Sequence, residues 1–278
     1  MKLIVLGCDG AAGMWQYAFS QTGMEGRLTG SRDMQEEAKH EELLRMLREG
    51  WDLCLLYGSH SDSVTEKLIG RLPEALPLIP VGSEAAALDL RRRENNGGAR
   101  KKPAVPAGSM APERGGAETG SGGSEEAGKW SAGGVVGRVN RNLLYGCREN
   151  YLELCRYLFG LQKEGQEEDC PLPQELPFEG MYFPEDGAGG KVCACWEEYA
   201  KELTARGEAD VLSLPRAGLI SHRSSWISDD LSVEAALSEE FRKRGIYLVC
   251  AFHSGAPEPA IKTHRLQEMQ DCFLRTPG

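Results

Sequence analysis

The sequence predicts an α/β fold with a parallel sheet in its N-terminal part, and two observations support this prediction. In residues 1–93, short apolar runs alternate with segments of helical periodicity, and the same alternation begins again near residue 213. Strands that alternate with helices need crossover connections, which produce parallel sheets. We therefore expect an α/β domain at 1–93 and the start of a second, incomplete α/β domain at 213–278.

Two segments of different character separate these expected domains. Residues 94–134 consist mainly of Gly, Ala, Ser, Pro and charged residues. They offer too little apolar surface to offset chain entropy, so we expect a disordered linker or insertion there. Residues 135–212 are expected to form a helical and Pro-rich connecting region. Prolines are dense between 171 and 184, which favours extended or turn backbone and excludes a helix there.

The individual elements follow from local patterns. Apolar runs predict strands at 3–6, 53–57, 76–81, 217–222 and 246–252. Apolar residues at helical spacing predict helices at 34–48, 64–72, 85–93, 135–144, 151–161, 195–204, 233–243 and 260–273. After the first strand, Gly7, Gly10 and Gly13 have the spacing G-x-x-G-x-x-G, and no helix is expected to follow. We interpret this motif as a tight strand-to-loop turn and not as a dinucleotide-binding turn.

Charge and hydropathy exclude several classes of protein. The formal charge of −10 argues against nucleic acid or an anionic membrane as partner, because both are bound by basic surfaces. The sequence has no apolar run long enough for a transmembrane helix, and its first apolar run meets Asp9 instead of a signal-cleavage site. The nine cysteines have no regular spacing, which indicates free thiols and a cytoplasmic protein.

Motifs that could bind a nucleotide or a metal are incomplete. Residues 123–130 resemble a P-loop, but Trp130 stands where Ser or Thr must reach magnesium, so no ATP site is expected. Cys193 and Cys195 are too close together for a zinc knuckle, and no metal site is expected. His40 lies among charges on an expected helix and is interpreted as solvated, and His60 as an ordinary loop histidine.

Polar and aromatic residues gather where the two C-terminal strands end. His222, Arg223 and Trp226 follow one expected strand, and His253 follows the next. Neighbouring parallel strands end at the same edge of a sheet, where ligands of α/β proteins bind. Arginine suits carboxylate groups and tryptophan suits planar macrocycles. Two interpretations stay open at this point: a ligand site at this edge, or two loops whose polar groups are satisfied by water.

Four short motifs follow one another in order between residues 135 and 255. They are GCREN at 146–150, PFEGMYFP at 177–184, AGLISHRS at 217–224 and FHSG at 252–255. In sequence and order they resemble the large subunits of cobaltochelatase (CobN type) and magnesium chelatase, which carry G-G-x-E-N, then P-x-x-G-[IL]-Y-H-P, then a strand ending in R-S. Two positions depart from the family pattern: Cys147 replaces the second glycine, and Phe183 replaces the histidine.

The resemblance implies insertion of a divalent metal ion into a tetrapyrrole. It suggests the N-terminal portion of the tetrapyrrole-binding large subunit of an ATP-dependent cobaltochelatase, which acts on Co²⁺ and a corrin precursor in cobalamin biosynthesis. In this family, separate AAA+-type ATPase subunits use ATP and Mg²⁺, so this chain itself is expected to bind no cofactor. The family subunit is several times longer, no catalytic residue is assigned here, and the chain alone is expected to be inactive.

The resemblance also gives an expected set of tetrapyrrole-binding residues. These are His222, Arg223, Trp226, His253, Glu149 and Asn150. Two alternatives to the cobaltochelatase interpretation stay open. One is a magnesium chelatase of chlorophyll biosynthesis. The other is a truncated, non-catalytic homologue that binds a tetrapyrrole, a metal or a partner subunit, and Phe183 in place of the family histidine favours this second alternative.

Overall fold

The computed structural model describes residues 1–58, 62–95, 134–164, 172–254 and 263–271, and the chain divides into two compact units. The first unit extends to Gln174, and the second begins at Glu175. The predicted α/β class is confirmed, with a parallel N-terminal sheet, intervening helices and a second sheet. The expected insertion at 94–134 lies outside the described residues except at its ends. The division into four segments stays a prediction.

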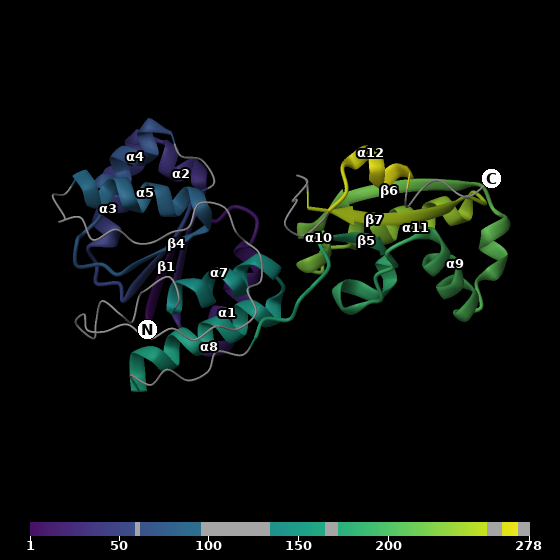
Figure 1. The fold of residues 1–278 in the computed structure, drawn as a ribbon, viewed down its shortest axis with the longest axis horizontal. Helices are drawn as coiled ribbons and strands as arrows, with labels where there is room; N and C mark the ends of the chain where they lie inside the picture. Colours follow the sequence, from purple (N-terminus) through teal and green to yellow (C-terminus); the bar gives the residue numbers. More distant parts are fainter. Residues whose placement is uncertain (59–61, 96–133, 165–171, 255–262, 272–278) are drawn as a thin grey trace, which may run out of the picture. The chain divides into compact units, whose positions relative to one another are not determined.

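The first unit contains a fully parallel sheet with the strand order β2-β1-β3-β4 (Figure 1). The strands are β1 (Lys2–Leu6), β2 (Glu25–Thr29), β3 (Leu53–Tyr57) and β4 (Leu78–Val81). The predictions of β1, β3 and β4 are confirmed. β2 was not expected, because its sequence EGRLT is mostly exposed at the sheet edge and contains no apolar run. Backbone pairing with β1 forms this strand, and its own hydrophobicity contributes little.

Helices cover both faces of this sheet (Figure 1). On one face, side chains of β1 and β3 pack with α3 (His40–Leu47), α4 (Ser63–Gly70) and α5 (Gly82–Asn95). On the other face, α1 (Ala12–Thr22) packs against α8 (Arg148–Glu164), and the ring edge of Trp15 meets Tyr151 at a centroid distance of 4.8 Å. β1 and β3 are therefore buried on both sides, as their continuous apolar runs predicted.

The edge of β4 is capped by a side chain from α7 (Val135–Tyr145). The Asn140 amide accepts a hydrogen bond from the Gly82 N–H at 2.7 Å and donates one to the Pro80 carbonyl at 3.0 Å. These contacts provide hydrogen-bond partners for backbone groups that would otherwise need water or a neighbouring strand. The helices α7 and α8 that the sequence predicted are confirmed, and both belong to the first unit.

Two helix predictions in the first unit were wrong. A helix does follow the glycine motif: α1 begins at Ala12, and its buried residues Met14, Trp15, Ala18 and Phe19 lie on one face. The helix expected at 34–48 is interrupted, because α2 (Ser31–Gln35) ends where the backbone extends at Glu36, before a short 3₁₀ turn and α3. His40 stabilises this break, since its buried ring bonds through Nε2 to the Met34 carbonyl at 2.8 Å. The interpretation of His40 as solvated was therefore also wrong.

The turn between α7 and α8 contains one of the two positions that depart from the family pattern. Gly146 and Cys147 both have positive φ angles, of 69° and 64°. Positive φ is unstrained for glycine and costly for residues that carry a Cβ. The second glycine of the family motif therefore has a conformational reason, and Cys147 occupies a strained position with a buried side chain.

The second unit contains a mixed sheet with the strand order β5-β7-β6 (Figure 1). β6 (Arg216–His222) pairs parallel to β7 (Tyr247–His253), as predicted. β5 (Glu179–Tyr182) pairs antiparallel to β7 and comes from the Pro-rich segment, for which only extended or turn backbone was predicted. Of the helix expected at 260–273, the structure describes only α12 (Leu266–Met269) as an α-helix, and part of that range lies outside the described residues.

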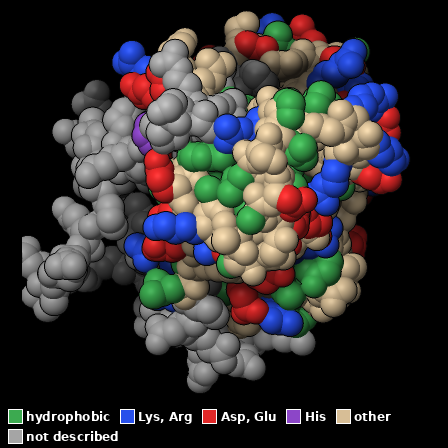
Figure 2. Space-filling view, turned by 90° about the vertical axis from the view of Figure 1, so that its right-hand side faces the viewer, with side chains coloured by type: hydrophobic (Ala, Val, Ile, Leu, Met, Phe, Trp, Pro, Cys, Tyr) green, Lys and Arg blue, Asp and Glu red, His purple; other side chains and the backbone are tan. Residues whose placement is uncertain are grey.

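Helices lie on both faces of the second sheet. α9 (Trp196–Ala205) packs on the face that carries Met181, Val249 and Ala251. α10 (Arg223–Ile227) and α11 (Ser232–Lys243) contact β7 from the face that carries Phe252. Figure 2 views the second unit from one side and shows hydrophobic side chains among charged ones on its surface. Among the described helices, none is both long and apolar enough to cross a membrane.

Candidate functional site

The carboxyl ends of β6 and β7 bring two predicted site residues together. In the parallel pairing of these strands, His222 lies directly opposite His253. The prediction that both histidine motifs end at one sheet edge is therefore confirmed by the register. His222 is exposed, and it caps the N-terminus of α10: its Nδ1 accepts a hydrogen bond from the Ser224 N–H at 3.2 Å and lies 2.7 Å from the Ser224 Oγ.

Arg223 is buried, and its guanidinium contacts the Pro-rich segment. Its Nε donates to the Pro177 carbonyl at 2.7 Å, and its Nη2 donates to the Leu176 carbonyl at 3.4 Å. The guanidinium also lies over the Phe178 ring, 4.5 Å from its centre. Arg223 thus fixes the segment that enters β5 against the end of β6.

Trp226 is also part of the core. Its indole is 1% exposed and stacks on Phe252, with a centroid distance of 4.4 Å and an interplanar angle of 11°. A macrocycle has no access to this indole in the structure. Trp226 instead fixes α10, and therefore the His222–Arg223 junction at its start, against β7.

A glutamate and a histidine that the sequence analysis did not single out complete this edge. Glu179 lies opposite His253 in the β5–β7 pairing. Its carboxylate accepts hydrogen bonds from His264 through the backbone N–H at 2.8 Å and the ring Nδ1 at 2.5 Å. The Nε2 of buried His253 lies 2.8 Å from the His264 carbonyl. Glu179 is brought beside His253 by the antiparallel pairing of β5 with β7, which the sequence analysis did not predict.

The remaining two predicted site residues lie in the first unit. Asn150 is buried and pairs with the backbone of Gln174: its Nδ2 donates to the carbonyl at 2.9 Å, and its Oδ1 accepts from the N–H at 2.8 Å. Glu149 is exposed in the first turn of α8. Asn150 therefore has a defined structural role, whereas Glu149 is accessible to a ligand.

Phe183, which replaces the family histidine, lies in the hydrophobic core of the second unit. Its ring stacks on Tyr199 at 4.5 Å, and the Arg206 guanidinium lies 3.8 Å from its centre on a cation–π contact. The Tyr199 hydroxyl lies 3.0 Å from that of Tyr247, and burial raises the pKa of Tyr247 to about 12. The side chain at position 183 thus contributes to packing.

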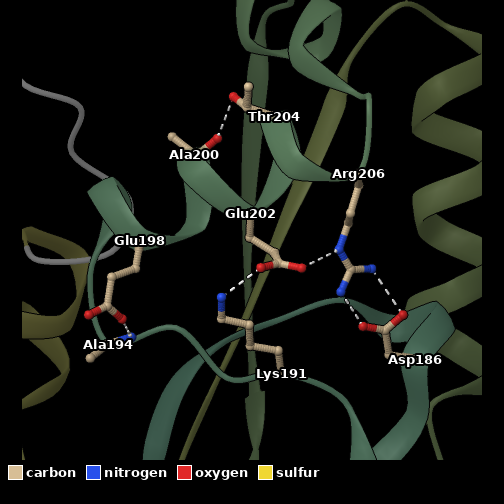
Figure 3. Close-up of polar contacts among 8 residues, drawn as sticks. All are labelled: Asp186, Lys191, Ala194, Glu198, Ala200, Glu202, Thr204 and Arg206. Carbon is tan, nitrogen blue, oxygen red and sulfur yellow. Dashed lines mark hydrogen bonds and ion pairs between the residues drawn. The ribbon is translucent and has the colours of Figure 1, made fainter.

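A charged network fixes the turn after β5 to α9 (Figure 3). The Arg206 guanidinium binds both oxygens of Asp186, and its Nε donates to Glu202 at 3.2 Å. Lys191 donates to the other Glu202 oxygen at 2.6 Å. The hydrogen bond from Arg206 holds the pKa of the Asp186 carboxyl below its usual range. This network stabilises the position of Phe183 under the Arg206 side chain.

Within the described part of the chain, no three His, Cys, Asp or Glu side chains are arranged to hold a metal ion. Cys193 is buried in the core, where burial raises the pKa of its thiol, and its backbone bridges to Met181. Cys195 precedes α9 and is half-buried. The chemistry at the β6–β7 edge is therefore that of imidazole and carboxylate groups.

The fold and this edge define an α/β segment with histidines at the ends of paired strands. Comparison with known families shows which family model this segment resembles. Residues 140–276, just under half of the chain, match the family model CobN/Magnesium Chelatase. This match confirms the resemblance of the motifs to that family. No curated protein matches the chain.

Among solved structures, the chain is similar to the catalytic subunit of cobaltochelatase from Mycobacterium tuberculosis. The identity is 13% and the TM-score 0.42, over 98% of this chain and 17% of that subunit. The chain thus spans 17% of the length of that structure.

Proposed function

We propose that this chain is the N-terminal portion of the tetrapyrrole-binding large subunit of an ATP-dependent cobaltochelatase. The observation that carries the proposal is the family match over residues 140–276, which includes β5, β6, β7 and α8. Co²⁺ and a corrin precursor of cobalamin biosynthesis are then the substrates. ATP and Mg²⁺ are used on separate AAA+-type partner subunits, and the assembly works in the cytoplasm.

The exposed and the buried members of the expected tetrapyrrole-binding set would have different roles in binding. His222 has an exposed side chain in the second unit and is suited to direct contact with ring substituents. Glu149 is exposed in the first unit, which is considered by itself. Arg223, Trp226, His253 and Asn150 are buried. Arg223 and Trp226 fix the start of α10, where His222 is exposed, and Asn150 fixes the backbone of Gln174. Amide and acid substituents of a corrin precursor are hydrogen-bonding partners for an imidazole N–H such as that of His222.

Metal insertion sets three chemical requirements. The ring must be held, its N–H protons must be accepted by a base, and the metal ion must lose bound water. The strand ends of the second sheet carry imidazole groups, which is the observation that supports placing the base there. The metal ion is a substrate in this scheme, and its site lies in the complete assembly.

The first test is binding of a tetrapyrrole to the purified chain, followed by absorbance. We expect a corrin precursor or a porphyrin to shift its absorption bands on binding, and His222→Ala to weaken that binding about tenfold. Arg244→Ala, at the exposed end of α11, is the control and should bind as the wild type does. Equal binding by His222→Ala and wild type, or no binding by either, contradicts the proposed site.

The activity itself needs the complete polypeptide that carries this chain, together with its ATPase partners. We expect ATP-dependent insertion of Co²⁺ into a corrin precursor. Insertion of Mg²⁺ into a porphyrin instead would assign the chain to magnesium chelatase. No insertion of either metal by an assembly that hydrolyses ATP contradicts the proposal.

A second candidate function is a non-catalytic homologue that binds a tetrapyrrole, a metal or a partner subunit. The packing of Phe183 between Tyr199 and Arg206 favours it, because no imidazole is available at that position. Phe183→His separates the two candidates. A substitution that raises insertion activity supports a degenerate site, whereas the main proposal predicts only a loss of about 1–3 kcal/mol in the free energy of unfolding, because a polar ring is buried.

A further inference from the structure

Glu179, His253 and His264 form a compact group at the end of the second sheet. The side chains of Glu179 and His253 are 14% and 5% exposed, whereas that of His264 is 41% exposed. The Glu179 carboxylate lies 2.5 Å from Nδ1 of His264 and 3.7 Å from Nε2 of His253. One nearly buried carboxylate therefore lies between two imidazoles, and one of those imidazoles is accessible to solvent.

The hydrogen bonds fix the proton positions on both rings. A carboxylate accepts hydrogen bonds, so the neutral His264 ring carries its proton on Nδ1, and Nε2 has the lone pair. A backbone carbonyl also only accepts, so His253 donates through Nε2 to the His264 carbonyl. His222 differs from His264, because its Nδ1 accepts from the Ser224 N–H, which leaves the proton of its neutral ring on Nε2.

We propose that His264 is the base that accepts N–H protons of the tetrapyrrole and that Glu179 is its positioning residue, an inference that rests on the proposed function. An imidazole that donates Nδ1–H to a carboxylate is held in one tautomer and one orientation, with the lone pair on Nε2. The backbone hydrogen bond from His264 to the same carboxylate adds a second anchor. The group lies at the strand ends where His222 faces solvent.

The proton transfer is balanced within this geometry. Each ring N–H bond breaks as its proton moves to Nε2 of His264, and the electron pair stays on the ring nitrogen and forms the bond to the divalent ion. The resulting imidazolium is stabilised by the negative charge of Glu179. Because the His264 side chain is partly exposed, the proton then passes to water and the neutral base is restored.

The test uses the complete polypeptide with its ATPase partners and compares three variants. We expect His264→Ala to lower the maximal rate of metal insertion roughly a hundredfold, while tetrapyrrole affinity changes less than twofold. Imidazole added to the solution should restore part of this rate. Glu179→Gln should lower the rate about tenfold. Glu239→Gln, the same change at an exposed position of α11, is the control and should leave the rate unchanged.

The outcomes distinguish a failure of the proposed base from a failure of the proposed chelatase function. An unchanged rate for His264→Ala, or a lowered rate that imidazole does not restore, contradicts the proposal that His264 is the base. If His264→Ala does not fold by circular dichroism, His264→Gln takes its place, because its amide can still donate to Glu179. Wild-type protein that neither binds a tetrapyrrole nor inserts a metal contradicts the proposed function, and the base is rejected with it. Wild-type insertion with fully active His264 variants rejects the base alone.

Discussion

The two sheets of the molecule use their strand ends in different ways. In the first unit, β1 and β3 are buried on both faces, and the turn after β1 closes with backbone contacts, since the N–H groups of Gly7 and Cys8 both donate to the Thr29 carbonyl. In the second unit, the mixed sheet places Glu179, His253 and His222 in register across three strands. The first sheet is organised for burial. The second places titratable groups in a row at its edge.

This difference shows that a row of polar side chains need not come from the most regular sheet. β6 is only half-buried, and β5 is a short strand from a Pro-rich segment, yet their pairing with β7 aligns the polar groups. Matched substitutions in the two units test this contrast.

The largest effect is expected for the two buried tryptophans. Trp226→Ala and Trp15→Ala should each lower the free energy of unfolding by about 3–5 kcal/mol, because each leaves a large cavity in its core. Chemical denaturation measures this loss. Only Trp226→Ala should also weaken tetrapyrrole binding, because α10 positions His222. Equal weakening by Trp15→Ala would show that the contrast between the units is wrong.

A smaller loss is expected when the guanidinium at the β6 end is removed. Arg223→Ala should cost about 2–3 kcal/mol in the free energy of unfolding, since two backbone carbonyls lose a charged donor. Arg138→Ala in the first unit is the comparison, because its guanidinium lies over the Tyr157 ring at 5.5 Å. Both variants are measured by urea denaturation. A loss for Arg223→Ala below that for Arg138→Ala contradicts the anchoring role.

The strained turn of the first unit gives a third comparison. Cys147→Gly should be about 1 kcal/mol more stable than Cys147→Ala, because glycine adopts the φ angle of 64° without strain. The difference in melting temperature between the two variants measures this difference in stability. Greater stability of the alanine variant would mean that the turn is not strained at this residue.

The smallest effect concerns the charged network of the second unit. The pKa of Asp186 is lowered by Arg206, so its stabilising contribution is present above the unfolded pKa of about 4 and is lost as the pH falls through the folded value. Asp186→Asn should remove about 1 kcal/mol or less at neutral pH and flatten the acid limb of the stability curve. Asp230→Asn, an exposed control, should leave that limb unchanged.

The residues explain which parts of the structure the sequence could predict. β1 and β3 were predictable because their burial on both faces requires continuous apolar runs. β2 was not, because an exposed edge strand is defined by its partner and not by its own composition. α1 was not predicted because glycine disfavours helices and Gly13 lies in its first turn, and packing of the apolar face formed by Met14, Trp15, Ala18 and Phe19 stabilises it.

The same reasoning applies to the candidate site. The pairing of His222 with His253 followed from two parallel strands that end alike. The burial of Arg223 and Trp226 did not follow, since their partners Pro177 and Phe252 are set by tertiary packing. Glu179 and His264 are separated by 85 positions in the chain, and only the β5–β7 pairing brings them together. Local patterns thus predicted the strand ends that carry His222 and His253, whereas Glu179 and His264 join them through contacts distant in the sequence.

The most direct test of the central claim is a nitrogen-15 NMR titration of the histidine side chains with a corrin precursor or porphyrin. His40 in the first unit is buried and bonded to Met34, and it serves as an internal reference. We predict that the ring signals of His222, His253 and His264 shift with saturation, whereas the His40 signal does not move. Saturable shifts of His40 with unchanged signals from the other three would contradict the assignment of tetrapyrrole binding to the edge of the second sheet.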